Sequence, residues 1–587
     1  MTKIFTLLLS SLFFSAFAGK NVEGSVILGN ATQVYKELHQ NSNEIKIDAT
    51  LKYNTLVTFI SSNSISGTLQ GYPESSYFIS TSSNKITGFV IVSKSEDIAY
   101  QFKTDEEGNV STTKTSMHKI MCVNYSNPEL IKQSAKTNQQ VLGGPAQGPI
   151  PSYSSLPSSS NVLYLDFDGY ELPAGTAWNN GNALSADAAG YTDTQIFQAW
   201  SIVAEDYAPF DINITTDENT FLNADTMTRV RMVFTNTSNW YGAAGGVAYV
   251  GIFDYWNQDY KTGWVFVNNL GNSAQNAGEA CSHEAGHTLG LQHHGTVVGV
   301  DSTEYYQGHG SWAPIMGAAY GKAISQFSKG EYNNAFCYEY NNQDQKVEIQ
   351  QDDISVISNF INLKADDHGN TTNNATDIVF INNNNIGAVD SASNNGLIGT
   401  ETDLDAFHFY TGGGGVNLSF KPSAALKTNL DIEVKLYDEN NVLQNTYNTA
   451  HNNTCINGVN INQNLNAGYY YVVVNGVGSG SATTGWSEYN SMGPYFISGT
   501  ISNPDINTNS LNESVLNLIS VYPNPLNGND FITLSQNIQQ VLVFDATGKL
   551  MKTEINTNRV DMSSLAQGLY TLQLNDKGEK TIVKIIK

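Results

Sequence analysis

The pattern of apolar and polar positions changes several times along the chain. Residues 19–160 mix strand-like runs such as TGFVIVS with polar turns, and end in GGPAQGPIPSYSSLPSSS, a composition typical of an extended, solvated linker. Residues 161–362 alternate strand-like runs with two stretches of helical periodicity, TDTQIFQAWSIVAEDYAPF and a second at residues 274–289. Strands interspersed with helices predict an α/β (α+β) domain there.

After residue 366 the chain returns to short alternating runs. FHFYTG, VNLSF, DIEVKLYD, YYYVVVNG and YFISGTI are separated by turn residues, which predicts an all-β sandwich over residues 366–502. A polar linker, NPDINTNSLNES, leads to a second small β domain at residues 513–587. The 587 residues are too many for one hydrophobic core, so we expect a multidomain protein.

Residues 1–18, MTKIFTLLLSSLFFSAFA, predict a secretory signal peptide: Lys3 precedes an apolar run that ends in a small-x-small cleavage pattern. That run is too short to span a bilayer, and no later stretch is long and apolar enough, so we expect an exported protein that does not span the membrane. Lys and Arg total 29 against 54 Asp and Glu, a net charge of −25. This balance argues against nucleic acid as a partner, because nucleic acid binds basic surfaces.

The stretch CSHEAGHTLGLQHH gathers four of the chain's ten histidines. His283 and His287 are four residues apart, so on a helix both rings reach one point and can bind Zn²⁺. Glu284 lies between them and suits a general base for the attacking water. Gly290 can end the helix in a left-handed conformation. The chain then turns, so that His293 becomes the third ligand and a fourth position stays open for water.

The stretch fits H-E-x-x-H-x-x-G-x-x-H, and with it this region resembles the metzincin zinc metallopeptidases, most closely the secreted bacterial reprolysin-like enzymes. SWAPIMGAAY resembles their Met-turn, which makes Met316 an apolar floor below the ligands. The resemblance implies a metzincin-like catalytic domain with a twisted sheet and two long helices. It also implies an extended substrate antiparallel to an edge strand, supplied by GVAYVGIF or GWVFVNN. His294 departs from the pattern, because reprolysins usually carry Asp after the third histidine.

Three of the four cysteines have a predicted role. Residues 19–160 lie between the signal peptide and the histidine motif, which suits a pro-segment, and Cys122 can act there as a cysteine switch by occupying the open zinc position. An ordinary buried cysteine is an equally good interpretation of Cys122. Cys281 and Cys337 flank the active-site helix and the Met-turn, and we expect a disulfide between them.

Two C-terminal stretches resemble known modules. GLIGTETDLDAFHFYTGGGGVNLSF and AGYYYVVVNGVGSG resemble the pre-peptidase C-terminal β-sandwich found behind secreted peptidases. Asp403, Asp405 and the acidic ADDHGN are candidate Ca²⁺ ligands, although solvated turn carboxylates are the simpler interpretation. VYPNP, VFDATGKL, SSLAQGLYTL and KIIK resemble the C-terminal sorting domain of type IX secretion substrates. That resemblance implies the type IX secretion machinery as a partner and a location outside the cell or at its surface.

Together these features predict a secreted zinc metalloendopeptidase that hydrolyses peptide bonds in protein or peptide substrates. One alternative is a non-catalytic cell-surface adhesin built on a metzincin-like domain. Glu284 argues against it, because a domain that no longer catalyses a reaction has no need of a general base. Another is an enzyme that applies the same zinc chemistry to a non-peptide amide, because the residues that select the substrate are spread over loops.

Overall fold

The structure is a computed structural model, and it describes residues 25–120, 150–504 and 521–587. Within these ranges it leaves out residues 83, 94–97, 116, 118–119, 300, 341–345, 384, 425–426, 449–454, 523–525, 527–529, 546–548 and 577–578. The contacts divide the chain into two compact units, Met1–Asp505 and Ile506–Lys587. The predicted signal peptide and Cys122 lie outside the described residues.

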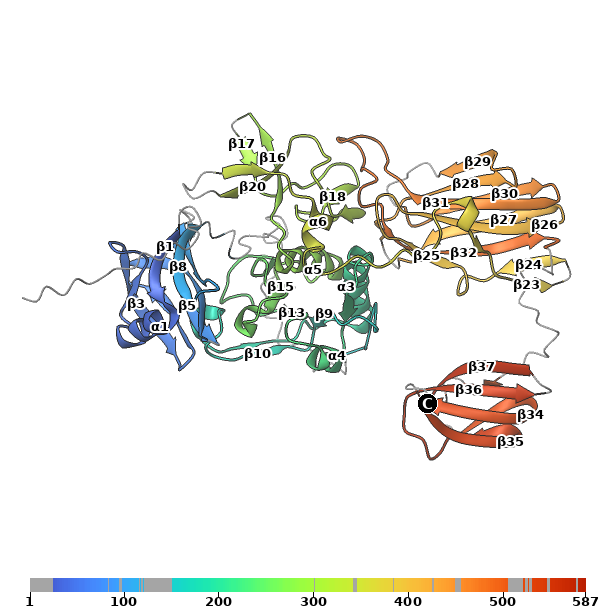
Figure 1. Ribbon diagram of the computed structural model, residues 1–587, viewed down its shortest axis with the longest axis horizontal. Coiled ribbons are helices and arrows are strands. Elements are labelled where there is room, and N and C mark those ends of the chain that lie inside the picture. The colour runs from blue at the N-terminus through green and yellow to red at the C-terminus, as the bar shows by residue number, and fades with distance from the viewer. Residues whose placement is uncertain are drawn as a thin grey trace, which may run out of the picture. The chain divides into compact units, whose positions relative to one another are not determined.

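The first part of the larger unit, the N-terminal region, is one antiparallel sheet with a helix against it (Figure 1). Its elements are β1 (Ser25–Asn30), α1 (Ala31–Gln40), β2 (Glu44–Lys46), β3 (Lys52–Ile60), β4 (Ser64–Leu69), β5 (Tyr72–Ser82), β6 (Lys85–Ser93), β7 (Ile98–Thr104) and β8 (Asn109–Thr115). The strand order is β1-β8-β7-β6-β5-β4-β3-β2. Helix α1 begins where the Asn30 side chain accepts a hydrogen bond from the Thr32 amide.

The central region, residues 150–363, contains the histidine motif. Its first elements are β9 (Val162–Asp166), β10 (Tyr170–Leu172), η2 (Asn179–Gly181), β11 (Leu184–Ala186), α3 (Asp193–Asp206), β12 (Asn213–Thr215), α4 (Glu218–Asn223), β13 (Arg229–Thr235), β14 (Gly246–Val247), η3 (Gln258–Tyr260), β15 (Thr262–Phe266) and α5 (Ala274–Thr288). Then follow β16 (His294–Val298), β17 (Asp301–Thr303), β18 (Trp312–Pro314), β19 (Ile324–Gln326), β20 (Ala335–Tyr340), β21 (Lys346–Ile349) and α6 (Asp353–Ile357).

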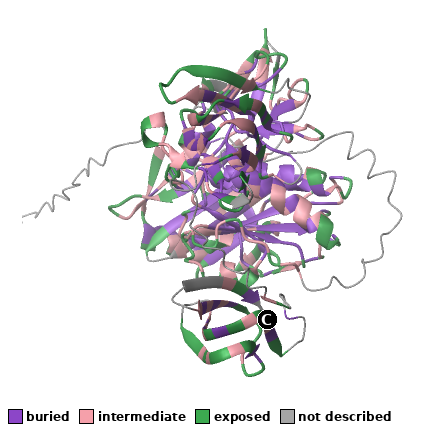
Figure 2. Ribbon diagram, turned by 90° about the vertical axis from the view of Figure 1, so that its right-hand side faces the viewer, coloured by how far each residue is buried: buried purple, intermediate pink, exposed green. Residues whose placement is uncertain are grey.

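One sheet of the central region has the order β12-β9-β13-β15-β14. Its first four strands are parallel, and β14 pairs antiparallel with β15 at the edge. Helices α3 and α5 pack closely, because Gly278 brings their backbones together: a Cβ added there would lie 3.0 Å from the Ala199 carbonyl oxygen. Every residue of α5 from Ala277 to Thr288 is buried. Figure 2 shows that buried residues fill the middle of the larger unit.

The predicted fold class, an α/β metzincin-like catalytic domain with a twisted sheet and two long helices, was wrong. The described chain is mostly β-strand in several separate sheets, and α3 and α5 have 14 and 15 residues. The N-caps Thr192 and Ser273 begin these helices. Gly290, with φ +91°, follows the end of α5. Helical periodicity correctly indicated two helices, but they are of ordinary length, and the strands of this region have only two to seven residues each.

Residues 366–504, the sandwich, form two sheets around one core. The elements are η4 (Thr372–Asn374), β22 (Thr376–Asp377), β23 (Phe380–Asn383), β24 (Ile386–Val389), β25 (Asn395–Ile398), β26 (Leu404–Thr411), β27 (Gly414–Pro422), β28 (Ile432–Asp438), β29 (Leu443–Asn448), β30 (Val459–Leu465), β31 (Gly468–Gly476) and β32 (Gly493–Ser502). One sheet has the order β22-β26-β31-β28-β29, and the other β23-β24-β32-β27-β30 with β25 beside β32. Phe409 and Val472 of the first sheet share a core with Leu418 and Ile497 of the second.

The smaller unit is a β domain with its own core. Its strands are β33 (Val521–Tyr522), β34 (Phe531–Asp545), β35 (Leu550–Asp561), β36 (Leu569–Asp576) and β37 (Glu579–Ile586). They pair in the order β33-β34-β36-β37, with β35 also beside β34. Ile532, Val543 and Leu572 belong to its buried core. In neither unit does a described helix have the length and apolar character that crossing a membrane requires.

Candidate metal centre

The structure brings the three predicted ligands together. Helix α5 carries His283 and His287 on one face, and the chain turns at Gly290, where the left-handed φ of +91° suits glycine. His293, which lies beyond the end of the helix, then brings its ring close to those of His283 and His287. The ligand atoms of His283, His287 and His293 all lie within 4.8 Å of one another, and the three residues are buried.

Each ligand ring is held at its Nδ1 atom by an oxygen acceptor. His283 Nδ1 lies 2.9 Å from the Ile315 carbonyl oxygen, and His287 Nδ1 lies 2.7 Å from the Leu291 carbonyl oxygen. His293 Nδ1 lies 2.8 Å from a carboxylate oxygen of Glu304. Carbonyl and carboxylate oxygens accept hydrogen bonds, so each ring carries its hydrogen on Nδ1 and presents a lone pair at Nε2. This orientation is typical of metal-binding histidines.

The spacing of the Nε2 atoms fits a zinc ion. A tetrahedral Zn²⁺ with Zn–N distances of about 2.0–2.1 Å holds its ligand nitrogens roughly 3.3–3.4 Å apart. The Nε2 atoms of His283 and His287 are 3.1 Å apart, and those of His287 and His293 are 3.0 Å apart. Burial lowers the pKa of His283 well below its ordinary value, and the neighbouring His287 and His293 act in the same direction. His283 is therefore neutral at neutral pH, as a metal ligand must be.

Glu284 lies fully buried on α5 between the first two ligands. The edge strand β14 passes directly beside it: a Cβ added at Gly246 would lie 2.7 Å from Glu284 Cγ and 2.8 Å from Oε1. Of the two segments predicted to supply the edge, GVAYVGIF therefore contains the edge strand, whereas GWVFVNN forms the interior strand β15. A peptide that extended the sheet at β14 would run past the Glu284 carboxylate.

Met316 packs against α5. Its side chain is fully buried, and a Cβ added at Gly286 would lie 2.7 Å from the Met316 sulfur. Gly286 precedes His287, so the methionine packs against the helix turn between the two ligands. The preceding residue, Ile315, supplies the carbonyl that orients His283. The Met-turn therefore contributes both an apolar floor and a hydrogen-bond acceptor.

Two residues of the site were not predicted from the sequence, Glu304 and Tyr305. Strands β16 and β17 form a hairpin in which Thr296 pairs with Thr303, and this register returns Glu304 to the neighbourhood of His293. The Tyr305 ring centroid lies 4.3 Å from that of His293. The segment HGTVVGVDST, with β-branched residues on both sides of a glycine, is the sequence signal that can indicate this hairpin.

His294 turns away from the ligands. Its Nε2 atom lies 3.0 Å from Asp353 Oδ1, and the other oxygen of Asp353 accepts a hydrogen bond from the Ser328 amide. Burial lowers the pKa of His294, but the Asp353 carboxylate outweighs that effect and the pKa is raised overall. His294 is thus a buried structural residue, and its departure from the reprolysin pattern leaves the three ligands in place.

The predicted disulfide between Cys281 and Cys337 is not formed in the structure. Cys281 faces the core beneath α5, where burial raises the thiol pKa well above its ordinary value. Cys337 lies on β20, directly opposite His294 of β16, in the sheet with the order β17-β16-β20-β21. Flanking the same helix and turn in the sequence does not place the two side chains together in space.

Three carboxylates of the sandwich form a second group whose side chains are of a kind that can hold a metal ion. Carboxylate oxygens of Asp366, Asp367 and Asp405 lie within 4.8 Å of one another. Asp405 is fully buried, and Tyr495 donates a hydrogen bond of 2.7 Å to its Oδ2 atom. Its Oδ1 atom has no hydrogen-bond partner among the described residues. Burial raises the pKa of Asp405 to about 8, and the nearby carboxylates of Asp403 and Asp367 add to the rise.

Residues 520–587 match the family model described as the secretion system C-terminal sorting domain. The predicted sorting domain is therefore confirmed, and with it the type IX secretion machinery as a partner. A protein with this domain is exported to the cell surface or the extracellular space.

Two solved structures show local similarity. The pre-peptidase C-terminal domain of a collagenase from Bacillus anthracis is 16% identical, with 21% of this chain and 92% of that one covered and a TM-score of 0.12. The BSP domain of a biofilm-associated protein is 11% identical, with 36% of this chain and 51% of that one covered and a TM-score of 0.11. Such low TM-scores establish no fold for this chain. None of the curated proteins matches the sequence.

Proposed function

We propose that this protein is a secreted zinc metalloendopeptidase. The observation that carries the proposal is the convergence of the Nε2 atoms of His283, His287 and His293 beside the buried carboxylate of Glu284. The H-E-x-x-H-x-x-G-x-x-H pattern and the Met-turn, both similar to metzincin signatures, support it.

His283, His287 and His293 would hold the ion, with their Nδ1 hydrogen bonds keeping the rings oriented. A bound zinc ion supplies Lewis acidity, which makes a water more acidic and a carbonyl more electrophilic. Glu284 accepts the proton of the attacking water and then donates it to the leaving amine. Met316 excludes water from below the ligands, because its side chain fills the space against Gly286.

The edge strand β14 is the proposed place for the substrate. An extended peptide that pairs with β14 gains main-chain hydrogen bonds whatever its sequence, and it passes beside Glu284. Main-chain pairing favours polypeptide substrates over small non-peptide amides, which offer little backbone to pair.

The N-terminal region is proposed to be the pro-segment. Phe78 and Phe89 of its sheet pack against Tyr260 and Tyr249 of the central region, within one shared core. The Val250 amide donates a hydrogen bond of 3.1 Å to the Ile120 carbonyl, three residues beyond the end of β14. The described part of the region therefore ends close to the edge strand at which the substrate is proposed to bind.

Cleavage of casein by the zinc-loaded mature chain tests the proposal, with Glu284→Gln as the comparison. Glutamine keeps the size of the side chain but cannot accept the proton, so the variant is expected to bind zinc and to lose cleavage by about 10²-fold or more. Wild-type protein that holds zinc and cleaves neither casein nor a peptide library would favour the adhesin. Cleavage restricted to small amides would favour the non-peptide alternative.

We also propose that the sandwich binds Ca²⁺ through Asp366, Asp367 and Asp405. Clustered carboxylates are the ligands this ion prefers, and the buried Oδ1 of Asp405 offers an acceptor that no described residue uses. Added CaCl₂ is expected to stabilise the folded chain by about 2.7 kcal/mol at a hundredfold excess over the dissociation constant. Asp405→Asn should abolish the calcium-dependent rise in melting temperature, whereas Asp390→Asn, an exposed change on the same sandwich, should keep it. A wild-type chain that calcium does not stabilise would contradict the site.

A further inference from the structure

A buried polar junction joins the sandwich to the two helices of the central region. Glu205 and Asp206 at the end of α3 and Glu279 on α5 are all at most 5% exposed. The sandwich presents Lys427, which is also buried, and its ammonium donates to Glu279 Oε1 and, at 2.7 Å, to the Ser325 hydroxyl. A lysine ammonium from the sandwich is thus paired, inside the protein, with a carboxylate on the metal-binding helix.

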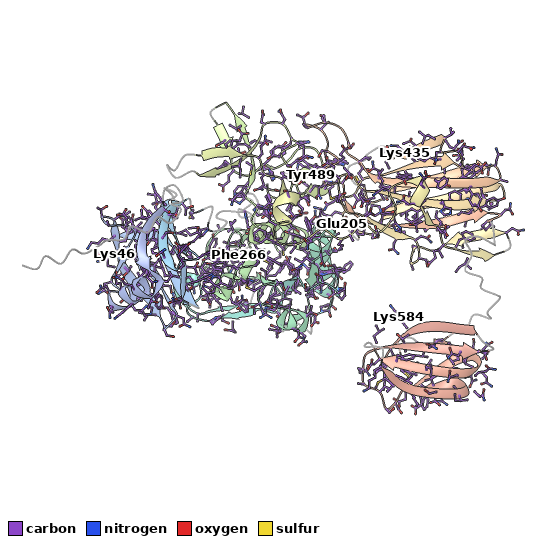
Figure 3. The ribbon with its side chains drawn as sticks, in the orientation of Figure 1. Lys46, Glu205, Phe266, Lys435, Tyr489 and Lys584 are labelled. Carbon is purple, nitrogen blue, oxygen red and sulfur yellow. The ribbon has the colours of Figure 1, made fainter. Side chains whose placement is uncertain are left out.

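The residues after Lys427 continue the junction. The Thr428 hydroxyl and the Asn429 amide donate to Glu205 Oε1 at 3.0 and 3.2 Å. The Asn429 side-chain amide donates to Asp206 Oδ1 at 2.9 Å. Glu205, labelled in Figure 3, lies where the central region meets the sandwich. Three consecutive sandwich residues therefore donate hydrogen bonds to Glu205, Asp206 and Glu279.

Ser282 connects this junction to the predicted ligand His283. The Ser282 hydroxyl donates to Asp206 Oδ2 at 2.5 Å, and its carbonyl accepts a hydrogen bond of 2.9 Å from the Tyr207 hydroxyl. Ser282 directly precedes His283. Glu279 lies four residues before His283 on α5, about one helical turn away. Sandwich residues therefore take part in the hydrogen bonds that fix the position of α5 along its axis, and with it the positions of His283 and His287.

A second connection reaches the Met-turn. The Gln326 side-chain amide donates to the Asn429 and Asn490 carbonyls of the sandwich at 2.7 and 2.9 Å. The Gln326 carbonyl accepts from the Ile315 amide at 2.8 Å, and the Ile315 carbonyl orients His283. The sandwich is therefore connected to both segments that position His283, directly to helix α5 and, through Gln326, to the turn that orients the ring.

We propose that Lys427 is a positioning residue for the zinc site, an inference that rests on the proposed function. The sandwich is then a structural part of the metal centre and not a separable accessory. The physical basis is the cost of a buried charge without a partner. If Lys427 is removed, Glu279 loses its counter-ion inside the protein, and α5 relieves the cost by shifting or by admitting water. Either response moves His283 and His287 relative to His293.

The test compares four full-length variants with wild type: Lys427→Met, Glu279→Gln, the double variant, and Lys435→Met. Lys435, labelled in Figure 3, pairs with Glu433 on the surface of the same sandwich and serves as the matched control. The readouts are the zinc dissociation constant against a competing chelator, amide hydrogen exchange of α5 in metal-free protein, and the melting temperature.

Lys427→Met is expected to weaken zinc binding roughly 10- to 100-fold, as the loss of supporting contacts around metal ligands does. It should also speed exchange of the α5 amides. The double variant removes the lysine together with the carboxylate that it pairs with, so it should recover most of both effects. The control should match wild type within about twofold.

A Lys427→Met chain with wild-type zinc affinity and wild-type α5 exchange would overturn the proposal, even if its melting temperature fell. A double variant as impaired as Lys427→Met would overturn it too. If Lys427→Met does not fold, the double variant is compared with Glu279→Gln alone. Zinc affinity and α5 exchange closer to wild type in the double variant would support the proposal, and no such recovery would overturn it. Because hydrogen exchange is measured without metal or substrate, failure of the proposed peptidase activity would not alter this result.

Discussion

Removal of the Glu304 carboxylate is predicted to weaken zinc binding while the chain stays folded. Glu304 accepts from His293 Nδ1 at 2.8 Å, and its side chain is 23% exposed. A hydrogen bond to a charged group contributes about 1.5–3 kcal/mol, and partial exposure favours the lower half of that range. About 1.5–2 kcal/mol corresponds to a zinc affinity roughly 10- to 30-fold weaker in Glu304→Ala.

The assay is competition for zinc with a chromophoric chelator at neutral pH. Glu304→Gln keeps an oxygen acceptor and loses the charge, so its affinity should fall between those of wild type and the alanine variant. Glu348→Ala, an exposed change on β21, is the control and should bind zinc like wild type. Metal-free Glu304→Ala should melt close to wild type. Unchanged zinc affinity in that variant would refute the role assigned to Glu304 in orienting His293.

Three further predictions concern the base, the pro-segment and the junction. Gly246→Ala should place a methyl group against Glu284 and reduce casein cleavage about tenfold or more with zinc content unchanged; full activity would contradict the contact. Cys122→Ser should yield an uncut precursor that already cleaves casein, and a silent mutant precursor would count against the cysteine switch. Burial raises the pKa of Glu205 to about 8, so the folded chain holds this proton to higher pH than the unfolded chain does. The stability it contributes is complete below the unfolded pKa of about 4.5 and is lost as pH rises through 8, so the urea midpoint should fall between pH 5 and pH 9. Glu205→Gln should flatten that fall, and an unchanged slope would contradict the assignment.

The cluster of His283, His287 and His293 was predictable because its geometry is local. The spacing of His283 and His287 acts within one helix, and Gly290 ends that helix where the pattern requires. Their supporting residues were not predictable in the same way. Glu304 is 11 residues from His293, and Lys427 is 148 residues from Glu279. Only the hairpin containing Glu304 has a sequence signal of its own.

The two wrong predictions share a cause. Both inferred three-dimensional arrangement from order along the chain. The disulfide prediction was wrong because Cys281 faces the core below helix α5, while Cys337 lies on strand β20 opposite His294. The α/β fold class failed because two helices with strong periodicity were given more weight than the many short strands around them, whose alternation over two to seven residues is a weaker signal.

The central claim is that three histidines hold one zinc ion, and X-ray absorption at the zinc edge of the purified chain tests it most directly. The account predicts one equivalent of zinc with three imidazole nitrogens at about 2.0–2.1 Å and one further light ligand. A chain that binds no zinc after reconstitution, or a spectrum with sulfur or with fewer than three imidazoles around the metal, would contradict it.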